Sequence, residues 1–355
     1  MRGTERFLLT ICGLLSTASL PVLADTIGFS TFVSGPSIAG VEGGNASAIA
    51  FTFAGNEFVG SVYLGANNNQ LFSTNLSGGN LQKFGSPIPG ASGEVVLGAS
   101  LGHAGFASGD IYTGSQANGQ IYHFANGGGT PTLFATLPGG DVARQIFFDP
   151  GSSFGGDMLV TTSSGHIYRI NSAGVATLLA AVGEDAEGMD IATGAWGPYA
   201  GDLLVGSESS GNLRLISPSG VVTLIAHVPG AETISFVPPN LDASDPLQGF
   251  YVADYPSDIQ FAAASVFTSQ NLLGDAIITN EFGGSSAFDL HYDSSSGTFS
   301  TTAFTFSGNQ ISQFEDGIFV GPQRIPDPAP EPASVFLLGA GLLGLLLVAR
   351  RRLLS

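Results

Sequence analysis

The strongest constraint on the fold is a repeat with a period of about 46 residues. Three units begin with Gly-Asp and an apolar strand, at Gly109, Gly156 and Gly201, with spacings of 47 and 45 residues. Each unit then continues through further short apolar segments separated by glycine-containing turns. Four short strands per unit at this period are typical of a β-propeller blade.

The unit that starts at Gly156 illustrates the pattern. Strands are predicted at residues 156–160, 165–170, 177–180 and 187–191. Side chains alternate between two environments along the second of these segments, as in a strand packed on both faces. A fourth segment closes each unit, and acidic residues stand at or near its start in several units.

The rest of the body follows the repeat less closely. An earlier unit runs through residues 62–97, and a later one runs from Gly274 to Val320. Residues 249–273 between them form a shorter, degenerate unit, and residues 26–53 would supply strands that close the ring. The prediction is an all-β protein with a single β-propeller of about six four-stranded blades over residues 25–320. Five or seven blades, a pair of β-sandwiches and a β-helix are the alternatives.

Four acidic residues stand at the start of the fourth segment of their units: Glu94, Glu187, Glu232 and Asp316. Equivalent positions of a propeller lie on one ring around its axis. Converging carboxylates repel one another unless a cation lies between them, and oxygen ligands suit Ca²⁺ or Mg²⁺. These residues are therefore the predicted metal ligands, and the alternative is that they are turn residues facing solvent.

The units loosely resemble NHL and regucalcin/gluconolactonase-like propellers, because several end in a short acidic-Gly-apolar strand, as at Glu187-Gly188 and Asp316-Gly317. In regucalcin-like propellers, acidic side chains near such strands hold a divalent metal. Enzymes of that family usually present an asparagine to the metal as well. No asparagine aligns with the four acids here, which favours binding over catalysis.

Other chemistry is poorly represented in the sequence. The five histidines show no zinc-ligand spacing, and neither a Gly-x-Ser-x-Gly elbow nor a nucleotide-binding fingerprint occurs. No catalytic residue and no organic cofactor is therefore predicted. The chain has 10 basic and 28 acidic residues, and its net charge of −18 argues against nucleic acid as a partner.

The N-terminus has the order of a secretory signal peptide. Arg2 and Arg6 precede an apolar run over residues 7–23, and Val22-Leu23-Ala24 places small or modest side chains before a cleavage site. The prediction is a signal peptide over residues 1–24, cleaved between Ala24 and Asp25. A retained N-terminal anchor is the alternative. Since the single cysteine, Cys12, lies in this segment, the mature chain would contain no cysteine.

The C-terminus combines three parts. Residues 321–332 are a proline-rich spacer that ends in Pro330-Glu331-Pro332, and residues 333–349 are an uncharged apolar run. As a helix, this run would span about 26 Å, just short of a hydrocarbon core of about 30 Å. Arg350, Arg351 and Arg352 follow at once and place the end of the chain on the cytoplasmic side. A transmembrane sorting tail is therefore predicted over residues 333–355.

This order of parts resembles the PEP-CTERM sorting signal, a tag recognised by exosortase, a membrane protease. The resemblance implies export by a Gram-negative bacterium, an inner-membrane-anchored precursor, and exosortase as a partner. A plain C-terminal anchor is the alternative. Because such tags occur on unrelated domains, the tail does not identify what the body does.

The leading functional hypothesis is an exported cell-surface or matrix protein with a non-enzymatic propeller for binding or adhesion. The resemblance of the tail makes exopolysaccharide, in a biofilm, the expected partner. A metal-dependent hydrolase of the lactonase type and a calcium-binding scaffold are the two alternatives.

Overall fold

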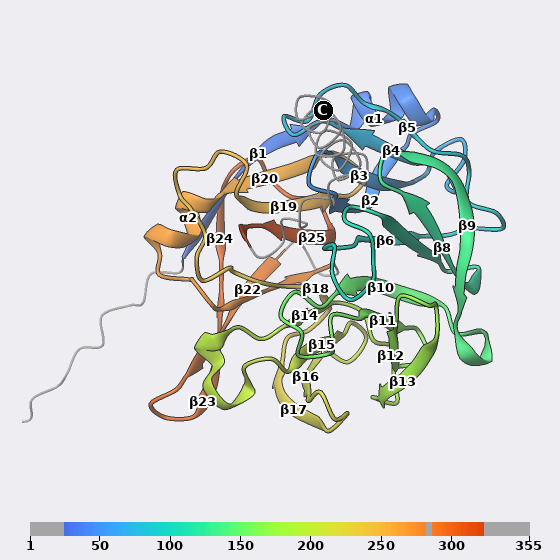
Figure 1. Ribbon diagram of the computed structural model, residues 1–355. Helices are drawn as coiled ribbons and strands as arrows, with labels where there is room; N and C mark the ends of the chain where they lie inside the picture. Colours follow the sequence, from blue (N-terminus) through green and yellow to red (C-terminus); the bar gives the residue numbers. More distant parts are fainter. Residues whose placement is uncertain (1–24, 282–285, 323–355) are drawn as a thin grey trace, which may run out of the picture.

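The computed structural model describes residues 25–281 and 286–322. Their strands form six sheets arranged around one axis (Figure 1). The prediction of an all-β propeller with about six blades is confirmed. The predicted signal peptide at 1–24 and sorting tail at 333–355 lie outside the described residues, as does the spacer beyond Pro322. No helix in the described part of the chain is long and apolar enough to cross a membrane.

Five blades are four-stranded antiparallel sheets. Within each of them, the strands follow one another in chain order from the axis to the outer edge. Blade 1 contains β2 (Ser47–Phe53), β3 (Phe58–Tyr63), β4 (Leu71–Thr74) and β5 (Gln82–Phe84). Blade 2 contains β6 (Val95–Ala99), β7 (Ile111–Ser115), β8 (Asn118–Ala125) and β9 (Gly128–Thr136). Blade 3 contains β10 (Ala143–Phe148), β11 (Met158–Thr162), β12 (His166–Ile170) and β13 (Ala176–Ala181). Blade 4 contains β14 (Met189–Ile191), β15 (Leu203–Ser207), β16 (Asn212–Ile216) and β17 (Val222–His227). Blade 5 contains β18 (Ala231–Phe236), β21 (Ala276–Asn280), β22 (Ser286–Asp293) and β23 (Thr298–Ala303).

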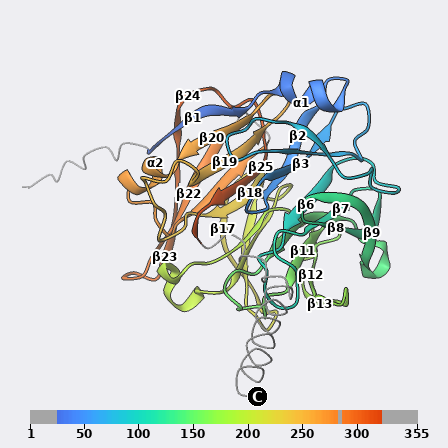
Figure 2. The ribbon, with the colours of Figure 1, turned by 45° about the horizontal axis from the view of Figure 1, so that its top comes forward.

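Blade 6 is five-stranded and closes the ring. From the axis outward it contains β25 (Phe314–Val320), β19 (Gly249–Asp254), β20 (Ile259–Ala263), β1 (Thr26–Val33) and β24 (Thr305–Gly308). The hairpin β19–β20 is inserted between the first two strands of blade 5, so the segment that looked like a degenerate unit belongs to the closing blade. Figure 2 shows β1 beside β20 in this blade.

Short helical segments join some of the strands. These are α1 (Gly35–Glu42), α2 (Ala264–Ser269) and the 3-10 turns Pro138–Gly140 and Gly194–Tyr199. Ser34 caps the start of α1, since its hydroxyl accepts a hydrogen bond from the Ser37 amide, and Gly43, with a positive φ of 78°, follows the end of the helix. Such a left-handed conformation favours glycine.

The blades begin and end at other strands than the units predicted from the sequence. The segment predicted as the fourth strand of a unit is the innermost strand of the next blade: β10 pairs with β11, with Phe148 opposite Met158. In four of the six blades, the acidic segment therefore lies at or just before the start of the innermost strand, which lines the axis. This difference arises because two strands that a hairpin joins form hydrogen bonds with each other in one sheet. The connection from β13 to β14, in contrast, leads into the next sheet.

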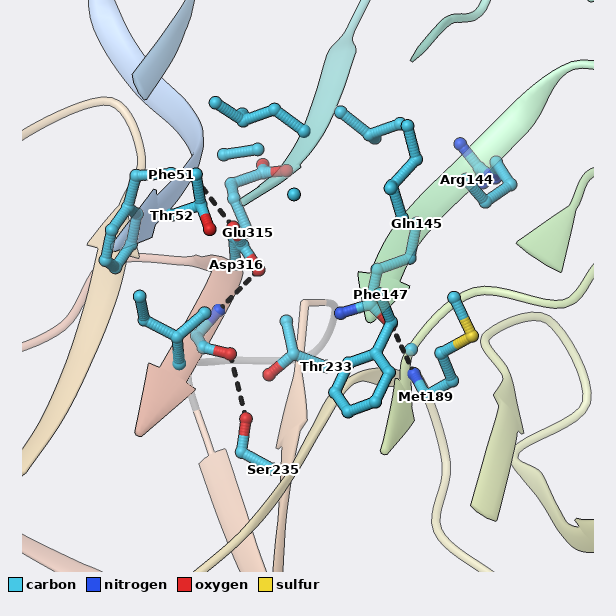
Figure 3. A pocket seen from close by; sticks show the side chains of 18 of the residues that line it. Phe51, Thr52, Arg144, Gln145, Phe147, Met189, Thr233, Ser235, Glu315 and Asp316 are labelled. Carbon is cyan, nitrogen blue, oxygen red and sulfur yellow. Dashed lines mark hydrogen bonds between the residues drawn. The ribbon is translucent and has the colours of Figure 1, made fainter. Parts of the chain in front are cut away.

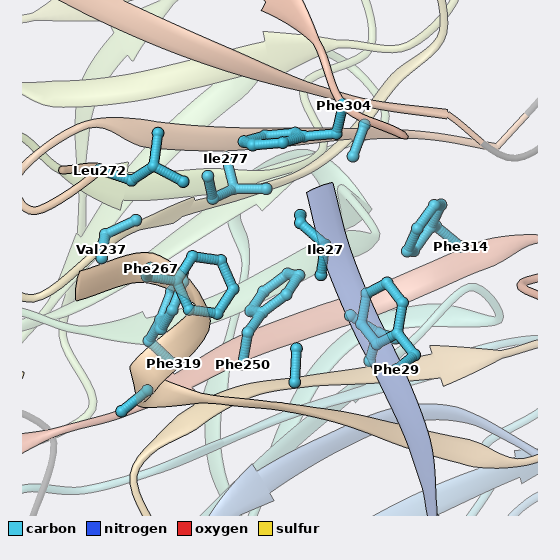
Figure 4. Packing of buried hydrophobic residues seen from close by; sticks show 14 of the residues in the cluster. Ile27, Phe29, Val237, Phe250, Phe267, Leu272, Ile277, Phe304, Phe314 and Phe319 are labelled. Carbon is cyan, nitrogen blue, oxygen red and sulfur yellow. The ribbon is translucent and has the colours of Figure 1, made fainter. Parts of the chain in front are cut away.

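Apolar clusters between neighbouring blades form the core. In the cluster of blade 6, the rings of Phe250 and Phe319 stack with centroids 4.7 Å apart, and Phe267 of α2 lies edge-on to Phe319 at 4.8 Å (Figure 4). Ile27 and Phe29 of β1 are buried in the same cluster. The N-terminal strand is therefore part of the core of the closing blade.

Side chains of the innermost strands also bond to the backbone of the next blade. Asp316 Oδ2 accepts a hydrogen bond from the Phe51 amide at 2.9 Å, and Asp190 Oδ2 accepts one from the Phe236 amide at 2.8 Å. Gln145 Oε1 accepts from the Met189 amide at 2.5 Å. These bonds hold neighbouring innermost strands at a fixed height along the axis.

Candidate functional site

The beginnings of the innermost strands surround one end of an axial cavity of about 90 Å³ (Figure 3). Aligning these strands places one residue of each blade at the same height. We call this set the mouth ring: Ile49, Glu94, Arg144, Glu187, Glu232 and Glu315. Four carboxyl groups and one guanidinium thus come together at one end of the cavity.

Three further acids join the mouth ring from neighbouring loops. Glu208 and Glu281 directly follow β15 and β21, the second strands of blades 4 and 5, and Asp185 lies in the connection to β14. Because a second strand is antiparallel to the innermost one, it ends where the innermost strand begins. We call these three acids together with Glu94, Arg144, Glu187, Glu232 and Glu315 the mouth cluster.

Arg144 is the cation of the mouth cluster. Its Nη2 atom lies 2.8 Å from Asp185 Oδ2 and 2.9 Å from Glu187 Oε2. Glu94 Oε2 lies 3.5 Å from Nη1, and Glu208 Oε2 lies 3.9 Å from Nη2. Only 17% of the Arg144 side chain is exposed. Three of the nearby acids have carboxylate oxygens within 4.8 Å of one another: Asp185, Glu187 and Glu208. The guanidinium therefore compensates the negative charge of this group.

A second group of this kind comprises Glu208, Glu232 and Glu281, whose ligand atoms also lie within 4.8 Å of one another. Glu232 is 6% exposed and lines the axial cavity. Its Oε2 atom accepts no hydrogen bond from residues 25–281 and 286–322. A buried carboxylate without a partner is costly, so this triad suits a cation supplied from outside the chain.

Burial and mutual repulsion raise the pKa values of the mouth cluster. Burial is the largest cause of the rise of the Glu208 pKa to about 8, and a hydrogen bond and repulsion from Glu281 add to it. Burial and the Glu281 and Glu94 carboxylates raise the pKa of Glu315 to about 8. The pKa values of Glu187 and Glu232 also lie well above the ordinary range, chiefly because of burial. Ionising the whole cluster at neutral pH therefore requires more positive charge than Arg144 supplies.

Three of the four acids predicted from the sequence, Glu94, Glu187 and Glu232, belong to the mouth cluster. Asp316 lies one position beyond the mouth ring, and its carboxylate accepts hydrogen bonds from the Phe51 and Gly317 amides. Glu315 stands at the ring position of this blade, and both Glu315 and Asp316 line the cavity (Figure 3).

Sequence reasoning missed Arg144, Asp185, Glu208, Glu281 and Glu315 as members of the site. A signal existed for two of them, since Glu208 and Glu281 occupy equivalent positions directly after second strands. Aligning the second strands would have shown this pair. Nothing local to Arg144 shows that its side chain reaches four carboxylates from two other blades.

Residues 328–352 match the family described as the PEP-CTERM protein-sorting motif. The predicted resemblance of the tail is therefore confirmed. The chain is an exported protein sorted to the cell surface through exosortase, with a β-propeller body. No curated protein matches the chain in sequence.

Solved structures resemble the body in fold. A chain of a nidogen/laminin complex is 11% identical, with a TM-score of 0.50 over 76% of this chain and 84% of that chain. A catalytically inactive virginiamycin B lyase from Staphylococcus aureus, crystallised with quinupristin, is 12% identical, with a TM-score of 0.47 over 72% and 69%. A streptogramin B lyase is 13% identical, with a TM-score of 0.46 over 77% and 72%. At 11% identity, the similarity to the chain of the nidogen/laminin complex indicates the propeller fold alone.

Proposed function

We propose that this exported propeller is a non-enzymatic surface-binding protein that holds a divalent cation at its axial mouth. The ligands are Glu208, Glu232 and Glu281. The observation that carries the proposal is the carboxylate of Glu232, which is buried, faces the cavity and has an unpartnered oxygen among the described residues. Exopolysaccharide at the cell surface remains the proposed partner, on the basis of the sorting motif.

The chemistry of the triad favours Ca²⁺. Carboxylate oxygens are hard ligands, and Ca²⁺ accepts six to eight of them in variable geometry, whereas Mg²⁺ demands a near-ideal octahedron. Glu208 and Glu281 lie in loops after strand ends, and the ligands come from two adjacent blades. Such a site therefore suits the larger ion, whose coordination tolerates loops. A bound cation would also crosslink blades 4 and 5.

Calcium should stabilise the fold through this triad. A ligand that binds only the native state contributes RT ln(1 + [L]/Kd), about 2.7 kcal/mol at a hundredfold excess over Kd. We expect Ca²⁺ to raise the melting temperature of residues 25–322, and Glu232→Gln to remove most of that rise. The measurement is thermal unfolding with EDTA and with increasing CaCl₂, together with calorimetric titration.

Glu57→Gln is the matched control, because Glu57 lies in the turn after β2, at the other end of the axis. This variant should keep the full response to Ca²⁺. A wild-type chain whose melting temperature is the same in EDTA and in CaCl₂ would show that the triad binds no calcium.

The sorting tail should be processed near Glu331. The mature surface protein is expected to lack the residues after about Pro332, and Glu331→Ala should leave a full-length, membrane-held precursor. Replacing Arg350, Arg351 and Arg352 by alanine should weaken retention before cleavage, since a charge at the bilayer centre costs on the order of 2.5–3.5 kcal/mol. Mass spectrometry of the surface-exposed protein measures the outcome.

Asp327→Ala provides the control for this experiment, because it removes a carboxylate from the same spacer just before the matched motif. It should be processed like the wild type. Surface peptides that end at Ser355 would mean that the tail only anchors the protein.

A further inference from the structure

We infer that both membrane-directed ends of the precursor leave the propeller from one face, opposite the mouth cluster, so that the membrane-held chain presents its mouth away from the bilayer. We call the face where the innermost strands end the far face. The inference rests on the membrane-held precursor of the proposed function and adds an orientation to it.

The C-terminal end of the body leaves from the far face. Strand β25 begins beside Glu315 in the mouth ring and ends at Val320. Gly321 lies against the loop that follows β18, because a Cβ atom built on it would be 2.8 Å from Pro238 Cγ. Since β18 is also an innermost strand and runs from the mouth cluster to the far face, the loop that follows it lies on the far face.

The N-terminal end starts from the same face. In blade 6, β19 is antiparallel to β25, with Gly249 opposite Val320, and β20 is antiparallel to β19. Strand β1 is antiparallel to β20 and therefore runs from the far face toward the mouth.

The first residues of the body are held at this position. The Thr26 amide donates to Gln270 Oε1 at 2.6 Å, and the Asp25 carbonyl accepts from the Thr305 amide at 2.8 Å. Gln270 follows α2, which comes directly after β20 has run from the mouth to the far face. The predicted cleavage site between Ala24 and Asp25 is therefore next to a residue anchored on the far face.

The length of the connecting chain supports this orientation. Residues 323–332 separate the last described residue from the apolar run, and 11 steps of about 3.1 Å, the rise expected of a proline-rich chain, would span about 34 Å. To place the mouth at the membrane, the chain would have to cross the width of blade 6 and the height of β25. Four strand spacings of about 4.8 Å and seven residues of about 3.3 Å make that path about 42 Å.

This orientation separates two events in space. The exosortase would reach the spacer beside the far face, while the mouth cluster remains open to solution and to partners too large to fit beneath the propeller. Binding at the mouth and cleavage of the tail would then not exclude each other.

Energy transfer from the protein to labelled lipid tests the orientation. Because Cys12 is the single cysteine of the chain, Cys12→Ser provides a background for one donor label at a time. Ser209→Cys labels the exposed turn after β15 at the mouth, and Ala243→Cys labels the exposed loop between β18 and β19 on the far face. Both chains also carry Glu331→Ala and are reconstituted into phosphatidylcholine vesicles that contain an acceptor-labelled lipid.

Transfer should be more efficient from position 243 than from position 209. Equal transfer, or more efficient transfer from position 209, would overturn the orientation while leaving the membrane tether intact. No transfer from either position would overturn the tether, and the orientation with it. Chains that end at Pro322 should show no transfer from either label, which establishes that the tail causes the signal.

Discussion

Replacing Arg144 by methionine should lower the free energy of unfolding by about 3–5 kcal/mol at neutral pH in the presence of EDTA. Removing one partner of a buried ion pair leaves the other charge buried and uncompensated, which has an effect of this size. Arg144 approaches four carboxylates within 4 Å, and methionine retains much of its packing volume without the charge. Urea denaturation of residues 25–322 measures the change.

The stability of the protein should also depend on pH in a defined direction. The pKa values of Glu208 and Glu315 rise from 4.5 to about 8 on folding, so the native state binds more protons than the unfolded chain between these values. The contribution of these two groups to the free energy of unfolding is fully present below about pH 4.5 and is lost as the pH rises through 8. Both the wild type and Arg144→Met should therefore be more stable at pH 5 than at pH 8.

Arg169→Met is the matched control. Arg169 pairs with Asp157 on the outer part of blade 3, and 33% of its side chain is exposed, so an effect of at most about 1 kcal/mol is expected. Equal losses for the two arginine variants would show that the mouth cluster does not depend on Arg144 for its charge balance.

Truncating Phe29 to alanine should destabilise the protein by about 3–5 kcal/mol, the usual range for a buried phenylalanine. Phe29 is 4% exposed and packs against the rings of Phe306 and Phe314, with centroids 5.9 and 6.3 Å away. The cavity would lie in the blade that closes the ring. Chemical denaturation monitored by circular dichroism measures the effect.

Ser30→Ala serves as the control on the same strand. The side chain of Ser30 is exposed and bonds weakly to the Phe261 carbonyl at 3.3 Å, so we expect a change within about 0.5 kcal/mol. A loss below 1 kcal/mol for Phe29→Ala would contradict a closing blade that depends on β1.

Arg144 and the proposed cation compensate two groups of carboxylates that share one residue. The guanidinium lies among Asp185, Glu187 and Glu208, and the proposed ion would lie among Glu208, Glu232 and Glu281. Glu208 belongs to both groups, so charge added at either group lowers the repulsion at the other. Ca²⁺ should therefore offset part of the loss caused by Arg144→Met.

Several features of this protein follow from local sequence alone. A Gly-Asp turn, a short apolar strand and the next glycine turn are determined within about ten residues, so a period of 46 predicts four strands per blade. The same locality allowed Glu94, Glu187 and Glu232 to be found, because each stands at a repeated position. The sorting motif is also local, and residues 328–352 carry it without reference to the body.

Tertiary structure decided what depends on closing the ring. Blade 6 combines β1, β19, β20, β24 and β25, whose pairings connect residues up to 279 positions apart, as for Thr26 and Thr305. The alignment of β25 with the other innermost strands places Glu315 rather than Asp316 at the height of the mouth ring, although both residues line the cavity. The convergence of Glu208, Glu281 and Arg144 depends on the packing of separate blades, since no interaction within a single repeat brings these side chains together.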